Sequence, residues 1–148
     1  MKYKAATFLI VDDDKVSVFA LQRMMKRLKL VNPVVTASDG LEALRILRGD
    51  GERSPLETPY IVILDLNMPR MDGHQFMSEL RSDPVLRKTV VFVSSTSNAT
   101  ADIDAAYSQN VAGYLVKDGT AEGFRSALKL IDEYAELVVL PATDPEQT

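Results

Sequence analysis

The chain has 148 residues, no cysteine, and a formal net charge of −4 from 17 basic and 21 acidic side chains. The length suits one domain, the absence of cysteine excludes disulfides, Cys-based zinc sites and thiol chemistry, and the acidic balance argues against a nucleic-acid partner. The N-terminal apolar run is too short for a signal peptide and no segment is long enough to span a bilayer, so we expect a cytoplasmic protein with no membrane partner.

Five short apolar runs alternate with segments of helical periodicity. The runs are rich in Val, Ile, Leu and Phe, which is typical of strands buried on both faces; they cover residues 7–11, 33–37, 60–64, 89–93 and 111–116. This alternation predicts an α/β domain over residues 1–140, with a doubly wound, five-stranded parallel sheet and helices on both faces. Residues 141–148 are polar and contain two prolines, and we expect a flexible C-terminal tail there.

Polar residues follow four of the predicted strands at their carboxyl ends, where open α/β sheets bind ligands. They are Asp12-Asp13-Asp14, Asp65, Ser94-Ser95 and Lys117-Asp118. Taken singly, each is more often a cap, turn or solvated residue than a catalytic group. Several carboxylates at one edge repel one another unless a cation joins them, and Mg²⁺ binds through one or two carboxylates plus water and phosphate oxygens. A metal, a carboxylate nucleophile, a lysine and a hydroxyl are the parts of a phosphoryl-transfer site.

Five motifs resemble, in order, the landmarks of the response-regulator receiver domain of two-component signalling: "FLIVDDD", "ASDGLEAL", "ILDLNMPRMDG", "FVSST" and "GYLVK". The resemblance covers about residues 8 to 138 and implies a flavodoxin-like fold with strand order 2-1-3-4-5. No output domain follows, so the chain resembles a stand-alone receiver. The long connection over residues 48–59 and the "LVVLP" segment are similar to the small receivers that partner phytochrome-type histidine kinases.

The resemblance also implies a function. Asp65 would be the phosphoacceptor, taking a phosphoryl group from a partner sensor histidine kinase and thereby switching an interaction surface. Mg²⁺ would be held by Asp12, Asp13, Asp65 and the backbone carbonyl of Asn67. The protein would then be a phosphoacceptor and not an enzyme that acts on other substrates. A downstream histidine phosphotransfer protein or target protein is a further expected partner, and the direction of phosphoryl flow stays open.

Three further residues receive roles from the same resemblance. Lys117 would pair with the phosphoryl oxygens, Ser94 would donate its hydroxyl to them, and Tyr114 would change rotamer together with Ser94. One position departs from the family pattern, because Asp118 stands where a proline with a cis peptide bond usually follows the lysine. A cis bond without proline costs about 2.5–4 kcal/mol, so the Lys117-Asp118 bond is either strained or trans.

Two alternatives compete with the receiver interpretation. Asp12, Asp14 and Val16 also resemble the nucleophile motif of haloacid-dehalogenase-type phosphatases, which need a further acidic pair after another strand. The sequence offers Asp132-Glu133 for that pair, but within a helical stretch, and this interpretation leaves Asp65 without a role. The second alternative is a phosphorylation-independent binding module, which usually lacks the acceptor or the acidic pair.

The last predicted helix carries two apolar stripes where one would cover a sheet. Leu130 and Tyr134 belong to the second stripe, and the apolar segment at residues 137–140 extends it. A homodimer through this helix would bury that surface. Alternatively, the tail folds back and covers Leu130 and Tyr134 within one chain.

Overall fold

The structure, a computed structural model, describes residues 5–142, in which strands and helices strictly alternate. The strands are β1 (Thr7–Val11), β2 (Val34–Ala37), β3 (Tyr60–Leu64), β4 (Val91–Ser95) and β5 (Gly113–Val116). The helices are α1 (Lys15–Arg27), α2 (Gly40–Arg48), α3 (Gly73–Ser82), α4 (Thr100–Ser108) and α5 (Ala121–Leu137). Each helix carries the chain back across the sheet, so every strand points the same way.

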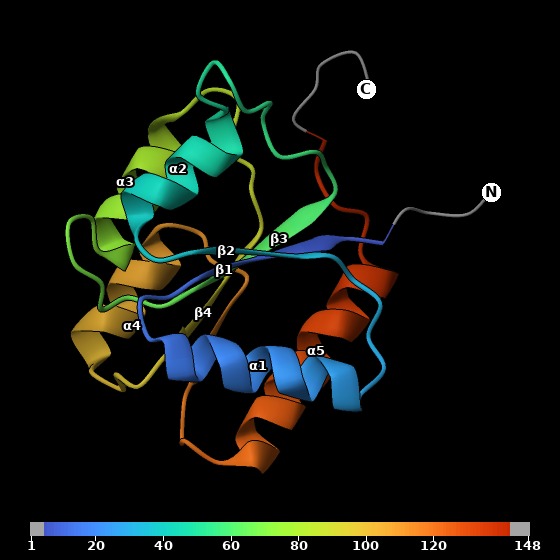
Figure 1. Ribbon diagram of the computed structural model, residues 1–148. Coiled ribbons are helices and arrows are strands. Elements are labelled where there is room, and N and C mark those ends of the chain that lie inside the picture. Colours follow the sequence, from blue (N-terminus) through green and yellow to red (C-terminus); the bar gives the residue numbers. More distant parts are fainter. Residues whose placement is uncertain (1–4, 143–148) are drawn as a thin grey trace.

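The sheet is parallel, with strand order β2-β1-β3-β4-β5 (Figure 1), which confirms the predicted fold. In this register Val11, the last residue of β1, lies beside both Leu64 of β3 and Ala37 of β2. The residues that follow β1 and β3, Asp12 and Asp65, therefore leave the sheet at the same edge.

The fourth strand lies two residues later than its apolar run indicates. It begins at Val91 and extends to Ser95, with Ser94 paired with Leu115 of β5. Thr89 instead belongs to a turn, because its N–H donates to the Leu86 carbonyl at 3.0 Å. The two serines therefore belong to the last strand positions and do not begin the following loop.

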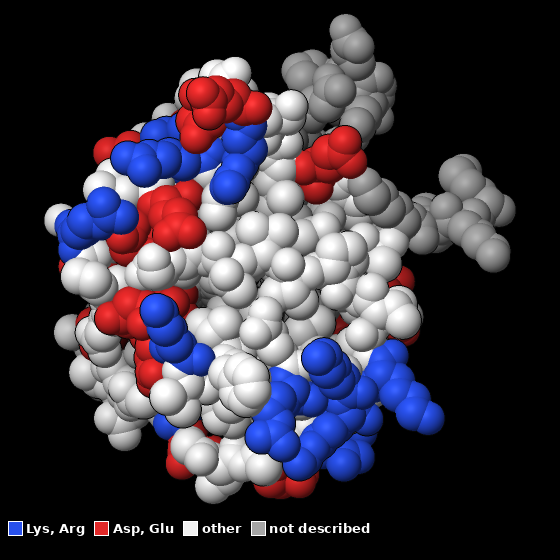
Figure 2. All heavy atoms as spheres, in the orientation of Figure 1, with Lys and Arg blue, Asp and Glu red and all other residues white. Residues whose placement is uncertain are grey.

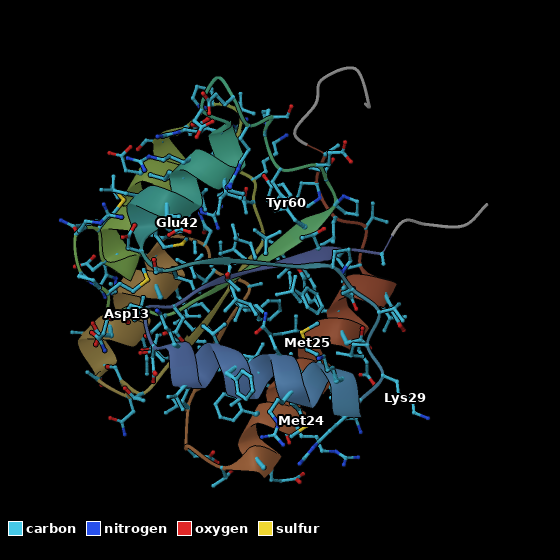
Figure 3. The ribbon with its side chains drawn as sticks, in the orientation of Figure 1. Asp13, Met24, Met25, Lys29, Glu42 and Tyr60 are labelled. Carbon is cyan, nitrogen blue, oxygen red and sulfur yellow. The ribbon has the colours of Figure 1, made fainter. Side chains whose placement is uncertain are left out.

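Helices cover both faces of the sheet (Figure 1) and create two hydrophobic cores. On one face, α2, α3 and α4 contribute buried side chains that include Leu44, Leu47, Phe76, Leu80 and Ala106. On the other face, α1 and α5 contribute Leu21, Met24, Met25, Leu128 and Ile131; Figure 3 marks the two methionines of α1. The central strands β1 and β3 are buried along their whole length, as unbroken apolar runs require.

The chain beyond α5 lies at the amino edge of the sheet. Residues 135–142 border a hollow together with Ala6, Thr58 and Pro59, which precede β1 and β3. Leu140 packs against the core on the α1–α5 face, whereas Leu137 and Val139 are 83% and 93% exposed. Of the tail predicted over residues 141–148, residues 143–148 lie outside the described part of the chain.

Charged side chains are unevenly spread over the face shown in Figure 2. Lys and Arg side chains gather over the end of α1, whose last turn carries Lys26 and Arg27, while acidic side chains lie toward its start. Asp13 marks that acidic end in Figure 3. Within residues 5–142, no helix has both the length and the apolar character needed to cross a membrane.

Candidate functional site

Three carboxylates converge at the carboxyl edge of the sheet. Asp12 and Asp13 follow β1, Asp65 follows β3, and one oxygen from each lies within 4.8 Å of the others. The sheet register brings them together, because the Asp65 N–H donates to the Val11 carbonyl at 2.8 Å and the Asp12 N–H donates to the Ala37 carbonyl at 3.0 Å. Asp12 is buried, Asp65 is half-buried and Asp13 is exposed, so solvent reaches the cluster on the side of Asp13.

The pKa of the Asp65 carboxyl is strongly perturbed by its surroundings. Burial raises its pKa to about 6; the charge of Lys117 acts against this, and the charge of Asp12 adds to it. The backbone amides of Asn67 and Leu66 lower the pKa. Because its ionised form loses water and faces a second carboxylate, Asp65 gains from any cation that enters the cluster.

Lys117 reaches the cluster from the end of β5. Its Nζ donates to Oδ2 of Asp12 at 2.8 Å, and the two side chains are 10% and 7% exposed. Its backbone N–H donates to the Ser95 carbonyl at 2.7 Å, which extends the ladder between β4 and β5. The three carboxylates and this single ammonium carry a formal charge of −2 when all are ionised (−3 + 1). The site is thus built to attract a further cation.

The third aspartate of the N-terminal run has a different task. Asp14 caps α1, because its Oδ1 accepts the Val16 N–H at 3.0 Å and its Oδ2 accepts the Ser17 hydroxyl at 3.0 Å. These bonds, the one from Ser17 foremost, hold the pKa of Asp14 below its usual range. A haloacid-dehalogenase-type site would need Asp14 beside Asp12, and its further pair, Asp132-Glu133, lies within α5. The geometry does not favour that alternative.

The loop after Lys117 is held by side-chain hydrogen bonds. The cis peptide bond of residues 5–142 lies at Thr58-Pro59, so the Lys117-Asp118 bond is trans. Oδ1 of Asp118 accepts the N–H and the hydroxyl of Thr120 at 2.9 and 2.7 Å. The Thr120 hydroxyl oxygen in turn accepts the Gly123 N–H at 3.0 Å and caps α5. Asp118 therefore shapes this turn without a cis bond, while Lys117 still reaches the cluster.

Ser94 and Tyr114 lie on the strands next to the cluster. Ser94 is 7% exposed, and it lines a cavity of about 30 Å³ together with Lys117 and residues of α5. Tyr114 packs against the core on the α2–α4 face, and its hydroxyl donates to the Ser97 carbonyl at 2.8 Å. The Tyr114 ring therefore lies against the loop between β4 and α4.

Sequence reasoning missed the polar contacts on the other side of that loop. The Ser97 hydroxyl donates to one carboxylate oxygen of Asp102 at 2.5 Å, and His74 at the start of α3 lies 2.9 Å from the other. His74 and Asp102 are 28 residues apart on different helices. No sequence spacing predicts such a pair, although a histidine directly after the loop of Asp65 could have drawn attention.

The donor set of the cluster fits a hard divalent cation. Asp12, Asp13 and Asp65 offer carboxylate oxygens in one place, and Asn67 lies two residues after Asp65 in an exposed loop. Mg²⁺ prefers oxygen ligands of this kind and keeps several waters, which the open side of the cluster accommodates. Softer metals favour imidazole or thiolate ligands, and the cluster contains neither.

The chain is similar in sequence and fold to known proteins. Residues 8–129 match the response regulator receiver domain. The chain is 30% identical over 135 residues to the response regulator Rcp1 of Synechocystis sp., covering 90% of this chain and 92% of Rcp1. The phosphorylated cyanobacterial phytochrome response regulator RcpA superposes with a TM-score of 0.84 and 31% identity, covering 94% of this chain and 100% of RcpA. The Mn²⁺-bound form of Rcp1 superposes with a TM-score of 0.81 and 31% identity, covering 93% of this chain and 99% of Rcp1. The chain belongs to the response regulator receiver family.

Proposed function

We propose that Asp65 accepts a phosphoryl group from the phosphohistidine of a sensor histidine kinase in a Mg²⁺-dependent reaction. One observation carries the proposal: the Asp65 carboxylate stands at a strand end in one cluster with Asp12 and Asp13. The ion pair of Lys117 with Asp12 supports it, because the pair places a cation beside the nucleophile. Membership in the receiver family supports the same chemistry.

In the transfer, a carboxylate oxygen of Asp65 attacks phosphorus. A P–O bond forms, the P–N bond of the phosphohistidine breaks, and the imidazole leaves with the electron pair and takes up a proton. Attack needs the ionised carboxylate, and a pKa of about 6 leaves Asp65 mostly ionised at neutral pH. Bound Mg²⁺ would neutralise charge that develops on the phosphoryl oxygens. Asp12, Asp13, Asp65 and the Asn67 carbonyl would hold it.

Lys117 and Ser94 would bind the transferred group. The Lys117 ammonium, now bonded to Asp12, would pair with a phosphoryl oxygen, and the Ser94 hydroxyl would donate to another. Both side chains line the same small cavity on the α1–α5 face of the sheet, whereas Tyr114 packs on the opposite face. Tyr114 would respond by a change of rotamer that breaks or re-forms its bond to Ser97. The face made by α4, β5 and α5 is the surface we expect to switch.

The relatives suggest the partner. RcpA is a phytochrome response regulator that was crystallised in its phosphorylated form, and another similar structure is the bacteriophytochrome response regulator RtBRR. We infer that a phytochrome-type histidine kinase phosphorylates this chain in the cytoplasm, where ATP is available to the kinase as phosphoryl donor. The chain would catalyse only its own phosphorylation and slow dephosphorylation, and a histidine phosphotransfer or target protein would read its state.

We also propose a homodimer through α5. Leu130 is 49% exposed on this helix, Leu137 is exposed at its last position, and Val139 is exposed beyond it. Tyr134 does not belong to this surface, because its ring packs edge-on against Phe92 with centroids 5.0 Å apart. Exposed apolar side chains at the end of one helix favour a two-fold contact between copies. Sedimentation should show a dimer for the wild type and a monomer for Leu130→Asp; a wild-type monomer, phosphorylated or not, would refute the dimer.

The phosphoacceptor is tested with acetyl phosphate, a small donor that needs no kinase. Wild type should become labelled in Mg²⁺ and stay unlabelled with excess chelator, and Asp65→Asn should stay unlabelled in both. Asp14→Asn is the matched control, because it removes the same charge beside the cluster but keeps a side chain that can cap α1. Labelling of Asp65→Asn to the wild-type level would remove Asp65 from its role.

A further inference from the structure

We propose that Asp39 and Arg70 form a positioning pair that fixes the loop between β3 and α3, and with it the Asn67 carbonyl beside Asp65. The inference rests on the proposed function of Asp65 and concerns residues that touch neither phosphoryl group nor metal. Arg70 lies in that loop, three residues after Asn67, and Asp39 lies directly before α2. The two residues are 31 positions apart in the chain.

The pair is buried at one end, and two N–H donors of Arg70 converge on one carboxylate oxygen. Asp39 is 4% exposed, and its Oδ2 accepts hydrogen bonds from Nε, at 2.7 Å, and from Nη2 of Arg70. Its Oδ1 accepts the Glu42 N–H at 2.9 Å, which caps α2. Burial alone would raise the pKa of Asp39, but the Glu42 N–H and the Arg70 guanidinium outweigh it and hold the pKa below its usual range. The carboxylate is thus a charged anchor that serves a helix and a loop together.

The loop backbone shows why an anchor is needed. Arg70 has φ of 62°, in the left-handed region that side chains other than glycine rarely adopt. Such a conformation persists only where surrounding contacts fix it. The bond from the Arg70 guanidinium to the N-terminus of α2 is a contact of this kind, because it originates from the strained residue itself.

A second contact lies directly beside the first. The Gly40 N–H donates to the Met71 carbonyl at 3.1 Å. A Cβ at Gly40 would lie 2.7 Å from Cγ and 2.9 Å from the carbonyl oxygen of Met71, closer than real Cβ atoms approach. Asp39 and Gly40, the cap and the first residue of α2, therefore hold the consecutive loop residues Arg70 and Met71. Beyond them Asp72 begins α3 with a capping box, so the loop is fixed from Arg70 onward.

The consequence concerns the short stretch between Asp65 and Arg70. Asp65 is fixed by its strand and Arg70 by Asp39, which leaves Asn67 in a four-residue bridge, residues 66–69, with both ends held. Mutation of residues that hold the ligands of a metal in place without touching the metal commonly lowers its affinity 10–100-fold, and small displacements of reacting groups slow transfer. Releasing Arg70 should therefore weaken metal binding and phosphorylation while the carboxylate cluster itself stays intact.

The test compares variants in Mg²⁺ titration calorimetry and in labelling by acetyl phosphate at saturating Mg²⁺. Asp39→Ser keeps a good helix cap but loses the partner of Arg70, and Arg70→Lys keeps the charge but loses the paired N–H donors of the guanidinium. Each should lower Mg²⁺ affinity by about tenfold and slow labelling, with Arg70→Ala at least as severe. Because the pair acts as a unit, the double variant Asp39→Ser/Arg70→Ala should be no worse than the poorer single variant.

Arg48→Ala is the matched control. It removes another partly exposed arginine that bonds a carboxylate, Asp83, at 2.9 Å from the opposite end of α2. A merely structural role of the Asp39–Arg70 pair would lower the urea midpoint and leave Mg²⁺ affinity unchanged, and that outcome would overturn the proposal. Failure of wild type to become labelled would instead contradict the phosphoacceptor role, whereas the Mg²⁺ titrations would still decide the positioning pair.

Discussion

The Nε2 atom of His74, on the first turn of α3, lies 2.9 Å from Oδ1 of Asp102 on α4. Through Ser97, which bonds both Asp102 and the Tyr114 hydroxyl, this contact continues to β5. The helix that follows the Asp65 loop is thereby joined to the residue that we expect to switch. These side chains are partly exposed, so the connection is open to change by single substitutions.

We predict that Asp102→Asn loosens α4 without unfolding the domain. The Ser97 hydroxyl, and after it His74, hold the pKa of Asp102 below its usual value of 3.8. A depressed pKa means that the ionised carboxylate stabilises the fold above pH 3.8, and that this contribution disappears as the pH falls through the folded-state pKa. The substitution removes it at neutral pH, so amides of α4 should exchange with solvent faster while those of α2 keep their rates.

The control for this measurement is Asp104→Asn, the same change on the same helix. Its carboxylate has no side-chain hydrogen bond to the residues of this network. Hydrogen exchange followed by mass spectrometry should show no change in α4 for this variant. Equal acceleration in both variants would show that helix charge, and not the contact with His74 and Ser97, sets the exchange rate.

Asp65 should make the metal-free protein less stable as the pH rises. Its pKa is raised from 3.8 to about 6, so the neutral carboxyl stabilises the fold fully below pH 3.8 and this contribution is lost as the pH passes 6. At a half-buried site we expect about 1 kcal/mol after solvent screening. Asp65→Asn should escape this loss. The free energy of unfolding of both proteins is measured with urea, in chelator, at pH 4.5 and pH 7. It should fall more between these two pH values for wild type than for Asp65→Asn. An equal change in the two proteins would contradict the prediction.

Asp13→Asn should reduce the stabilisation by Mg²⁺ and leave the fold intact. A ligand at 100 times its Kd stabilises a protein by about 2.7 kcal/mol, and the variant should gain less at the same concentration because it offers one carboxylate fewer. Without metal it should be at least as stable as wild type, since a repulsion is relieved. Thermal unfolding with and without Mg²⁺ measures both effects. Asp14→Asn, outside the cluster, should respond like wild type.

Gly123→Ala should disturb the loop that carries Lys117. A Cβ at this position would lie 2.8 Å from Cγ of Asp118, so the carboxylate must leave Thr120. The loss of these hydrogen bonds from Thr120 to Asp118 should lower the free energy of unfolding by about 1 kcal/mol and slow phosphorylation of Asp65. Ser126→Ala, on the exposed side of α5, is the control. A Gly123→Ala protein that is more stable than wild type, as helix propensity alone predicts, and is labelled at the wild-type rate would show that the turn does not matter.

The sequence predicts those parts of the molecule that depend on local pattern. Unbroken apolar runs identify β1 and β3, and an aspartate follows each. Because parallel strands end at the same edge of a sheet, the sequence also predicts that these two aspartates lie near one another. The run at residues 89–93 misplaces β4, since Thr89 is drawn into a turn by Leu86 and Ser94 pairs with Leu115. An apolar run indicates which residues are buried, but the backbone hydrogen bonds to neighbouring strands decide where β4 begins and ends.

Contacts between distant polar residues are not visible in the sequence. Asp39 in "ASDG" looks like a simple helix cap, and nothing near it indicates that Arg70 occupies its other oxygen. The sequence shows that Asp118 replaces the expected proline. It does not show that Asp118 bonds Thr120 and so shapes the turn, because this contact depends on the geometry of the loop. Such pairs follow from the fold, because only the packing of α2 against the loop brings them within reach.

The position of the chain after α5 has a practical consequence. Residues 135–142, the end of α5 and the segment after it, lie beside Ala6 and Pro59, at the edge of the sheet opposite to Asp12 and Asp65, and Figure 1 shows the first and last described residues of the chain on that side. A fluorescent reporter attached at residue 5 or residue 142 would sit across the domain from the carboxylates. Labelled protein should thus remain open to kinase and metal, whereas a reporter beside Val139 would report on contact between two copies.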